Sequence, residues 1–251
     1  MLRYVCFSLF FFLPLSAAFA ADTEYAANQK AYDALGAAQA YALGFTGSGV
    51  TVAVVDNGTL VTHQELKDQF SELQKDEYND QTVLEHGTPV ASLIAGKKDG
   101  TGMHGVAYDA QIVAFAVELN DGVDCPSCYQ SYTEAWELLA TDEFDAVKII
   151  NNSIGDNEHL PSSSPAAAEI SAAKALVAKD KLIVASAGNE TSLSPAIAPA
   201  GLPYYDSSLK YNFISAIAYN PSYSPSSPYF LASYTNLAQN AQEWSLAAPV
   251  G

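Results

Sequence analysis

The sequence predicts an α/β fold built around a mostly parallel sheet. Short runs of β-branched and apolar residues alternate along the chain with segments whose apolar residues recur at steps of three and four. The first pattern is typical of strands buried on both faces, and the second of helices that present one apolar face. Strands that alternate with helices form right-handed β-α-β units, which place the strands parallel in one sheet.

The predicted elements follow one another from residue 21 onward. Residues 21–44 are rich in alanine and have apolar residues at helical spacing, and the turn-rich stretch 44–49 ends this helix. Strands are predicted at 50–55, 110–117, 146–151, 181–187 and 213–219, and further helices at 86–95, 130–139 and 165–178. Pro, Ser and Tyr dominate residues 219–230, which we expect to form a surface loop.

The first twenty residues have the composition of a secretory signal peptide. Arg3 precedes an apolar run over residues 4–15, and residues 16–20 then offer an A-x-A cleavage site. The run is shorter than the roughly 20 apolar residues of a membrane-spanning helix, which argues against a membrane anchor. We therefore expect residues 1–20 to be removed and an exported, soluble chain to begin at Ala21.

The charge and hydrophobicity of the chain exclude several classes of binding partner and of protein. The formal net charge is −17, and such an acidic surface repels nucleic acid and anionic membranes. Hydrophobic residues make up 49% of the chain, which indicates a packed domain and excludes a disordered acidic tail. The length of the mature chain suits one α/β domain.

Two cysteines lie in one short motif, Cys125-Pro-Ser-Cys128. A C-x-x-C motif occurs as a redox pair, as half of a zinc site, or as a local disulfide. Here the motif follows a loop-like stretch, residues 120–124, and no second C-x-x-C exists to complete a zinc site. In an oxidising compartment a disulfide between Cys125 and Cys128 is the favoured interpretation.

Polar residues follow three of the predicted strands at their carboxyl ends. Asp56 follows the strand at 50–55, Ser153 the strand at 146–151, and Asn189 the strand at 181–187. Ligands of open parallel sheets bind outside the carboxyl ends of the strands. The three residues are therefore expected to converge on one edge of the sheet.

His86 and Asp56 are the candidates for a base and the carboxylate behind it. His86 stands at the start of a predicted helix, before Gly87, and a carboxylate can orient an imidazole and stabilise its cation. Taken alone, Asp56 is better interpreted as a turn residue in Asp-Asn-Gly, and the alternative for His86 is a surface histidine. His63, His104 and His159 lack a comparable context, and we expect them to be ordinary surface histidines.

Two further segments could contact a substrate. The amide of Asn189 could donate a hydrogen bond to a developing oxyanion, although an Asn after Gly188 also suits a left-handed turn. The backbone of Ser153, Ile154 and Gly155 could pair with an extended peptide by strand addition. The glycines at 47 and 49 precede their strand, which excludes a dinucleotide-binding loop.

Together these segments resemble the subtilisin-type serine proteases, the subtilases. The matching stretches are "GSGVTVAVVDNG", "HGTPVASLIAG", "GVAYDAQIVAFAV", "KIINNSIGD" and "KLIVASAGNE", followed by "SYTNLAQ" and "LAAPVG". They run in family order across nearly the whole mature chain. The resemblance implies a three-layer α/β/α fold with a mostly parallel central sheet, a catalytic domain over residues 21–251, and endopeptidase activity on polypeptide substrates.

The resemblance also implies a role for each candidate residue. Asp56 would orient His86, His86 would take a proton from a serine, and Asn189 would stabilise the oxyanion. Ser153, Ile154 and Gly155 would hold the substrate backbone and line one wall of the main specificity pocket. Members of the family often bind structural calcium, but no loop of this sequence has convincing ligand spacing, so no cofactor or metal ligand is predicted.

The sequence departs from the family pattern in several places. Asn57 stands where the family usually has Ser or Thr, and Pro89 where a second His is common. No inhibitory pro-domain separates the signal peptide from the catalytic region. This arrangement and the stretch "INNSIG" resemble the subtilase passengers of Gram-negative autotransporters more than secreted subtilisins.

The nucleophile is the largest departure. The Gly-Thr-Ser-Met segment that carries the reactive serine of the family is absent, and the sequence stops after Ala248-Pro-Val-Gly251. We therefore expect an N-terminal portion of a longer protease that, as given, hydrolyses peptides at no useful rate. The alternatives are a non-catalytic subtilase-like binding module and a thiol-redox protein built on Cys125 and Cys128.

Overall fold

The structure is a computed structural model that describes residues 22–79, 86–118, 125, 127–155, 167–190, 194–220 and 231–250. The expected signal peptide and His159 lie outside these residues, as does almost all of the expected surface loop at 219–230. Within the described residues, six strands form one parallel sheet in the order β2-β1-β3-β4-β5-β6. Their bounds are β1 Thr51–Asp56, β2 Gln111–Ala116, β3 Val147–Asn152, β4 Leu182–Ser186, β5 Phe213–Tyr219 and β6 Ser245–Pro249.

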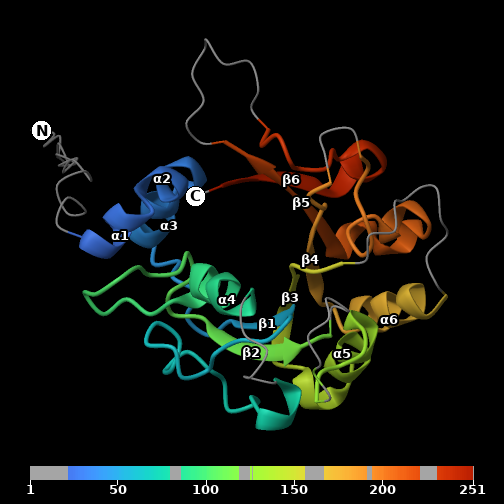
Figure 1. Cartoon of the computed structure of the whole chain (residues 1–251), viewed down its shortest axis with the longest axis horizontal. Helices are drawn as coiled ribbons and strands as arrows, with labels where there is room; N and C mark the ends of the chain where they lie inside the picture. Colours follow the sequence, from blue (N-terminus) through green and yellow to red (C-terminus); the bar gives the residue numbers. More distant parts are fainter. Residues whose placement is uncertain are drawn as a thin grey trace, which may run out of the picture.

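Helices cover both faces of the sheet, as Figure 1 shows. Helix α4 (Gly87–Ala95) packs against β1 and β2 on one face, and α5 (Tyr132–Leu139) and α6 (Ala167–Ala178) pack together on the other. Five 3₁₀ helices occur in the described chain: η2 Asp76–Tyr78, η3 Asp142–Phe144, η4 Leu202–Tyr204, η5 Ser207–Asn212 and η6 Gln239–Trp244. The predicted three-layer α/β/α fold is thereby confirmed.

Strand β1 shows why the sheet is central. All six of its residues are buried, and successive side chains enter different cores. Val52 and Val54 pack with the residues of α4, whereas Ala53 and Val55 pack with those of α5 and α6. Burying a Val side chain contributes about 1.5 to 3 kcal/mol, so the apolar run stabilises both layers at once.

The order of the strands places a functional edge between β1 and β3. From β1 the chain passes to β2 on one side of it, and then returns to β3 on the other. Ligands of open α/β sheets bind at such a switch point, beyond the carboxyl ends of the strands. Asp56, Ser153 and Asn189 end or follow β1, β3 and β4, which are neighbours in the sheet.

The N-terminal segment differs from the single predicted helix. Residues 23–42 form three short helices, α1 Thr23–Ala27, α2 Gln29–Leu35 and α3 Ala37–Ala42. Gly36 adopts a φ of 71°, in the left-handed region that glycine favours, and so ends α2 before α3 can continue it.

The same segment covers His104, which was expected from the sequence to be a surface histidine. This residue is fully buried rather than on the surface, because α1 to α3 pack over it. The ring of Tyr32 stacks on His104 at a centroid distance of 5.0 Å, and Tyr25, Tyr41 and Tyr108 also contact it. In the same N-terminal segment, Oε1 of the buried Glu24 accepts hydrogen bonds from the backbone N–H groups of residues 99–101 at 2.9 to 3.1 Å.

Candidate active site

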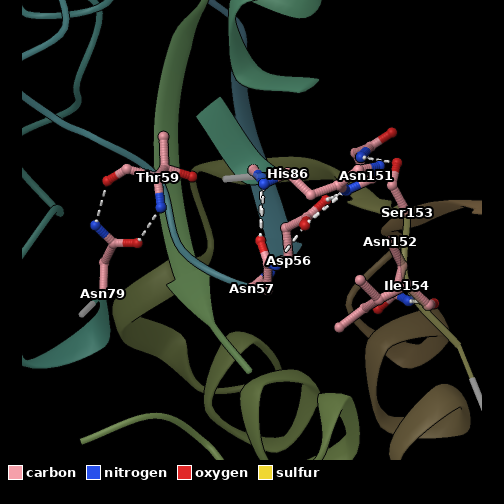
Figure 2. Close-up of polar contacts among 10 residues, drawn as sticks. Asp56, Asn57, Thr59, Asn79, His86, Asn151, Asn152, Ser153 and Ile154 are labelled. Atoms are coloured by element: carbon pink, nitrogen blue, oxygen red, sulfur yellow. Dashed lines mark hydrogen bonds and ion pairs between the residues drawn. The ribbon is translucent and has the colours of Figure 1, made fainter. Parts of the chain in front are cut away.

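The site begins where β1 ends. Asp56 is fully buried, and both of its carboxylate oxygens face Nδ1 of His86, at 2.9 and 3.0 Å (Figure 2). The side chain of His86 is 55% exposed, so solvent reaches the ring while its carboxylate partner is screened from water. The structure thus brings together the two residues that the sequence analysis paired by their chemistry and by the family resemblance.

Asp56 determines the direction in which the pKa of the His86 imidazole is shifted. The hydrogen bond to this carboxylate raises the pKa of His86, partial burial lowers it, and the attraction between the charges raises it again. The net result is a raised pKa, which means that the hydrogen bond and the charge attraction of Asp56 together outweigh the desolvation of the ring. Because a carboxylate only accepts hydrogen bonds, it selects the form of His86 with hydrogen on Nδ1, which leaves Nε2 able to accept a proton.

Gly87 lets α4 approach the loop after β1. A Cβ built on Gly87 would lie 2.3 Å from the carbonyl oxygen of Gly58 and 2.7 Å from Oγ1 of Thr59. Thr88 accepts a hydrogen bond from the backbone N–H of Leu60 at 2.9 Å, which ties the same loop to the first turn of the helix. A side chain at position 87 would therefore separate His86 from Asp56.

The segment after β3 is held by amide side chains. Asn151 donates a hydrogen bond to Oγ of Ser153 at 2.8 Å, and Asn152 donates to the carbonyl of Ile154 at 2.6 Å (Figure 2). The side chain of Ile154 is buried in the core beside α5 and α6, so its contribution is to anchor the segment. Gly155 lies against the carbonyl of Ala198, which a Cβ at position 155 would meet at 2.2 Å.

Asn189 lies in a turn after β4. Gly188 has a φ of 109°, and a Cβ on it would overlap Nδ2 of the buried Asn236. The side-chain Oδ1 of Asn236 accepts a hydrogen bond from the backbone N–H of Glu190 at 3.0 Å, and its Nδ2 donates one to the Glu190 carboxylate. Asn189 itself is exposed and lines a recess of about 240 Å³ beside the ends of β4, β5 and β6.

The model of the subtilase family matches residues 47–251. The chain belongs to the subtilase family. It is 37% identical over 135 residues to an extracellular serine protease of Serratia marcescens, covering 51% of this chain and 12% of that protein. It is 30% identical over 168 residues to fervidolysin of Fervidobacterium pennivorans, covering 63% and 23%. The chain therefore spans less than a quarter of the length of these two relatives.

Solved structures support the subtilase fold. Sphericase is 28% identical with a TM-score of 0.59, covering 81% of this chain and 67% of that one. The crystal structure of fervidolysin, described as a keratinolytic enzyme related to subtilisin, is 23% identical with a TM-score of 0.65, covering 87% and 31%.

Asp56 and His86 form the candidate catalytic dyad of this subtilase. Two asparagine side chains that bind the backbone near it were not identified as site residues from the sequence. Oδ1 of Asn57 accepts the backbone N–H of His86 at 3.0 Å and that of Gly87 at 3.4 Å. The buried Asn79 binds both the N–H and the carbonyl of Thr59, at 2.9 and 2.7 Å (Figure 2). The unusual Asn at position 57 was a sequence signal for the first, whereas nothing in the sequence pattern links Asn79 to Thr59.

The remaining candidates are the two cysteines of the C-x-x-C motif. Cys125 and Cys128 form a disulfide in the structure and pack against Ala116 at the end of β2. In the described residues, no group of three or more His, Cys, Asp and Glu side chains is arranged to hold a metal ion. No helix within these same residues has the length and apolar character needed to span a membrane.

Proposed function

We propose that this chain carries the Asp–His part of the catalytic site of a secreted serine endopeptidase. The observation that carries the proposal is the contact of Nδ1 of His86 with both oxygens of the buried Asp56, while the His86 side chain remains partly exposed to solvent. This arrangement suits a general base whose tautomer is fixed by a carboxylate. The relatedness to extracellular serine proteases supports the same assignment.

The reaction would proceed by nucleophilic attack of a serine on a peptide carbonyl. Nε2 of His86 would remove the hydroxyl proton of the serine, and Asp56 would stabilise the imidazolium that forms. The same imidazolium would then protonate the leaving amine. The amide of Asn189 would donate a hydrogen bond to the oxyanion, a contribution of about 3 kcal/mol where such a donor is removed from other enzymes.

The substrate would lie along the edge formed by β1, β3 and β4. The backbone of Ser153 and Gly155 would pair with an extended peptide, because Ile154 anchors this segment from below. The amide hydrogen bonds from Asn151 and Asn152 hold the segment in place before the peptide arrives. Such pre-ordering lowers the entropy cost of binding.

The serine itself is proposed to lie beyond Gly251. No Gly-Thr-Ser-Met segment occurs in the sequence, and the ring of His86 hydrogen-bonds, within the described residues, to Asp56 alone. We further propose that residues 1–20 direct export, where an oxidising compartment would keep the Cys125–Cys128 bond intact.

The test is to determine the uninterrupted gene sequence past codon 251 and to express its longest product. That product should cleave casein and should be labelled by a serine-directed fluorophosphonate. A product that contains no serine in a subtilase-type segment, and neither labels nor cleaves, would identify a non-catalytic binding module instead.

A further inference from the structure

His86, the residue proposed as the base, immediately precedes helix α4 and is its N-cap. His86 occupies the N-cap position with φ −78° and ψ −36°, and its side chain makes no hydrogen bond to the first turn of the helix. The first N–H groups of any helix lack partners within the helix and need acceptors from elsewhere. A Ser, Thr, Asp or Asn at the N-cap usually supplies one, but here the ring of His86 is bound to Asp56.

Asn57 supplies the acceptor from another part of the chain. Its Oδ1 accepts the backbone N–H of His86 at 3.0 Å and lies 3.4 Å from the backbone nitrogen of Gly87. The hydrogen bonds therefore hold the backbone of the base from the loop after β1, 29 residues earlier in the sequence.

The same residue also contacts the carboxylate. The backbone N–H of Asn57 donates a hydrogen bond to Oδ1 of Asp56 at 2.8 Å. One residue thus fixes the carboxylate through its main chain and the backbone of His86 through its side chain (Figure 2).

We propose that Asn57 is a positioning residue for the dyad, which holds the His86 backbone so that Nδ1 faces the Asp56 carboxylate. This inference rests on the proposed function for its catalytic meaning, although the geometry is independent of it. A Ser or Thr, the residue usual in the family here, carries its oxygen one bond closer to the backbone and therefore reaches less far toward the N–H groups of His86 and Gly87. An Asp could reach them but would place a second negative charge beside Asp56.

The first test follows the His86 ring in this same chain. Nitrogen-labelled histidine is titrated by NMR in the parent protein, in Asn57→Ala and in Asn57→Asp. Asn57→Ala should lower the pKa of His86, because a freer backbone weakens the contact with Asp56. Asn57→Asp should raise it, because it keeps the acceptor and adds a negative charge at the N-terminus of α4.

Asn212→Ala is the matched control. The side chain of Asn212 likewise binds the backbone of another element, in this case by donating a hydrogen bond to the carbonyl of Lys181 at 3.1 Å, but Asn212 precedes β5 at the opposite end of the sheet. This variant should leave the His86 titration unchanged. The proposal is overturned if Asn57→Ala folds, as judged by circular dichroism, and titrates His86 like the parent. If Asn57→Ala does not fold, an unshifted titration in Asn57→Asp overturns it equally.

The second test uses the longest natural product of the gene. Asn57→Ala should lower kcat by about a hundredfold with KM little changed, because a small misplacement of a catalytic group has an effect of that size. Asn57→Asp should recover part of the loss. An inactive parent with the expected NMR shifts would refute the proposed function while leaving the positioning role intact, and an active parent with an unshifted Asn57→Ala would do the reverse.

Discussion

The chain contains two His-Gly pairs, and the two histidines differ in their hydrogen-bond partners and in their exposure to solvent. His86 precedes Gly87, contacts a buried carboxylate and is 55% exposed. His104 precedes Gly105, donates from Nδ1 to the neutral carbonyl of Gly105 at 2.9 Å and is fully buried. In the described residues, Nε2 of His104 has no hydrogen-bond partner, and tyrosine rings surround it. The comparison teaches that a charged partner and access to solvent, rather than the local sequence, mark the histidine suited to act as a base.

The largest difference between the two histidines is expected in catalysis. In the longest natural product of the gene, His86→Ala should lower kcat by about 10⁶-fold, the size of effect seen when the base of such a site is removed. His104→Phe keeps an aromatic ring among the tyrosines and should leave kcat within a few-fold. Steady-state cleavage of a peptide substrate measures both. Equal losses in the two variants would show that the comparison is wrong.

Replacing the carboxylate should have the next largest effect. Asp56→Asn keeps the shape of the side chain but offers the ring a neutral partner, so kcat should fall by about 10⁴-fold. The raised pKa of His86 should also fall, which NMR titration would show. Asp68→Asn, on the exposed loop after β1, serves as the control and should change neither quantity. Full activity in Asp56→Asn would exclude the dyad.

The His104 region should respond in stability instead. Glu24→Ala removes the acceptor of three backbone N–H groups, and the free energy of unfolding should fall by about 1 to 3 kcal/mol. Urea denaturation measures the loss, and hydrogen exchange should localise it to residues 99–101. Glu72→Ala, at an exposed position, is the control. If Glu24→Ala instead shifted the His86 titration, the two regions would be coupled.

The smallest expected effect is a shift in pH dependence. The base must be neutral to accept a proton, so kcat/KM should rise with pH through the pKa of His86, at a midpoint above the ordinary value of about 6.5. The stabilising attraction between Asp56 and the imidazolium is present below the unfolded-state pKa and is lost as pH rises through the folded one. A pH–rate profile measures the midpoint. A midpoint at or below the ordinary value would contradict the role of Asp56.

The sequence predicted the elements that are set by local pattern. The buried run of β1, the start of α4 at His86 and the three polar strand ends are all readable from residues close together in the chain. These patterns were enough to predict the fold and to place Asp56 at the carboxyl edge of the sheet, whereas the pairing of Asp56 with His86 was expected from their chemistry and from the resemblance to the subtilases. Strand β6 was missed because Ser-Leu-Ala-Ala-Pro has no β-branched residue to indicate a strand.

The parts that the sequence could not predict depend on partners far apart in the chain. Asn79 binds Thr59 across 20 residues, and Asn236 supports the turn at Gly188 and Glu190 from 46 residues beyond Glu190. His104 is buried by tyrosines of the N-terminal segment, whose packing no periodicity reveals. An asparagine looks the same in the sequence whether its side chain is on the surface or binds the backbone of a distant segment.

Strand β6 has a consequence for handling this protein. It is an edge strand of the described sheet and pairs with β5 on one side. The side chain of Leu246, near its middle, is 61% exposed. Helix α2 contacts β6, but an edge strand that exposes an apolar side chain can still pair with strands of other molecules. The 251-residue chain should therefore self-associate as its concentration rises, and light scattering of a Leu246→Lys variant should show that tendency reduced.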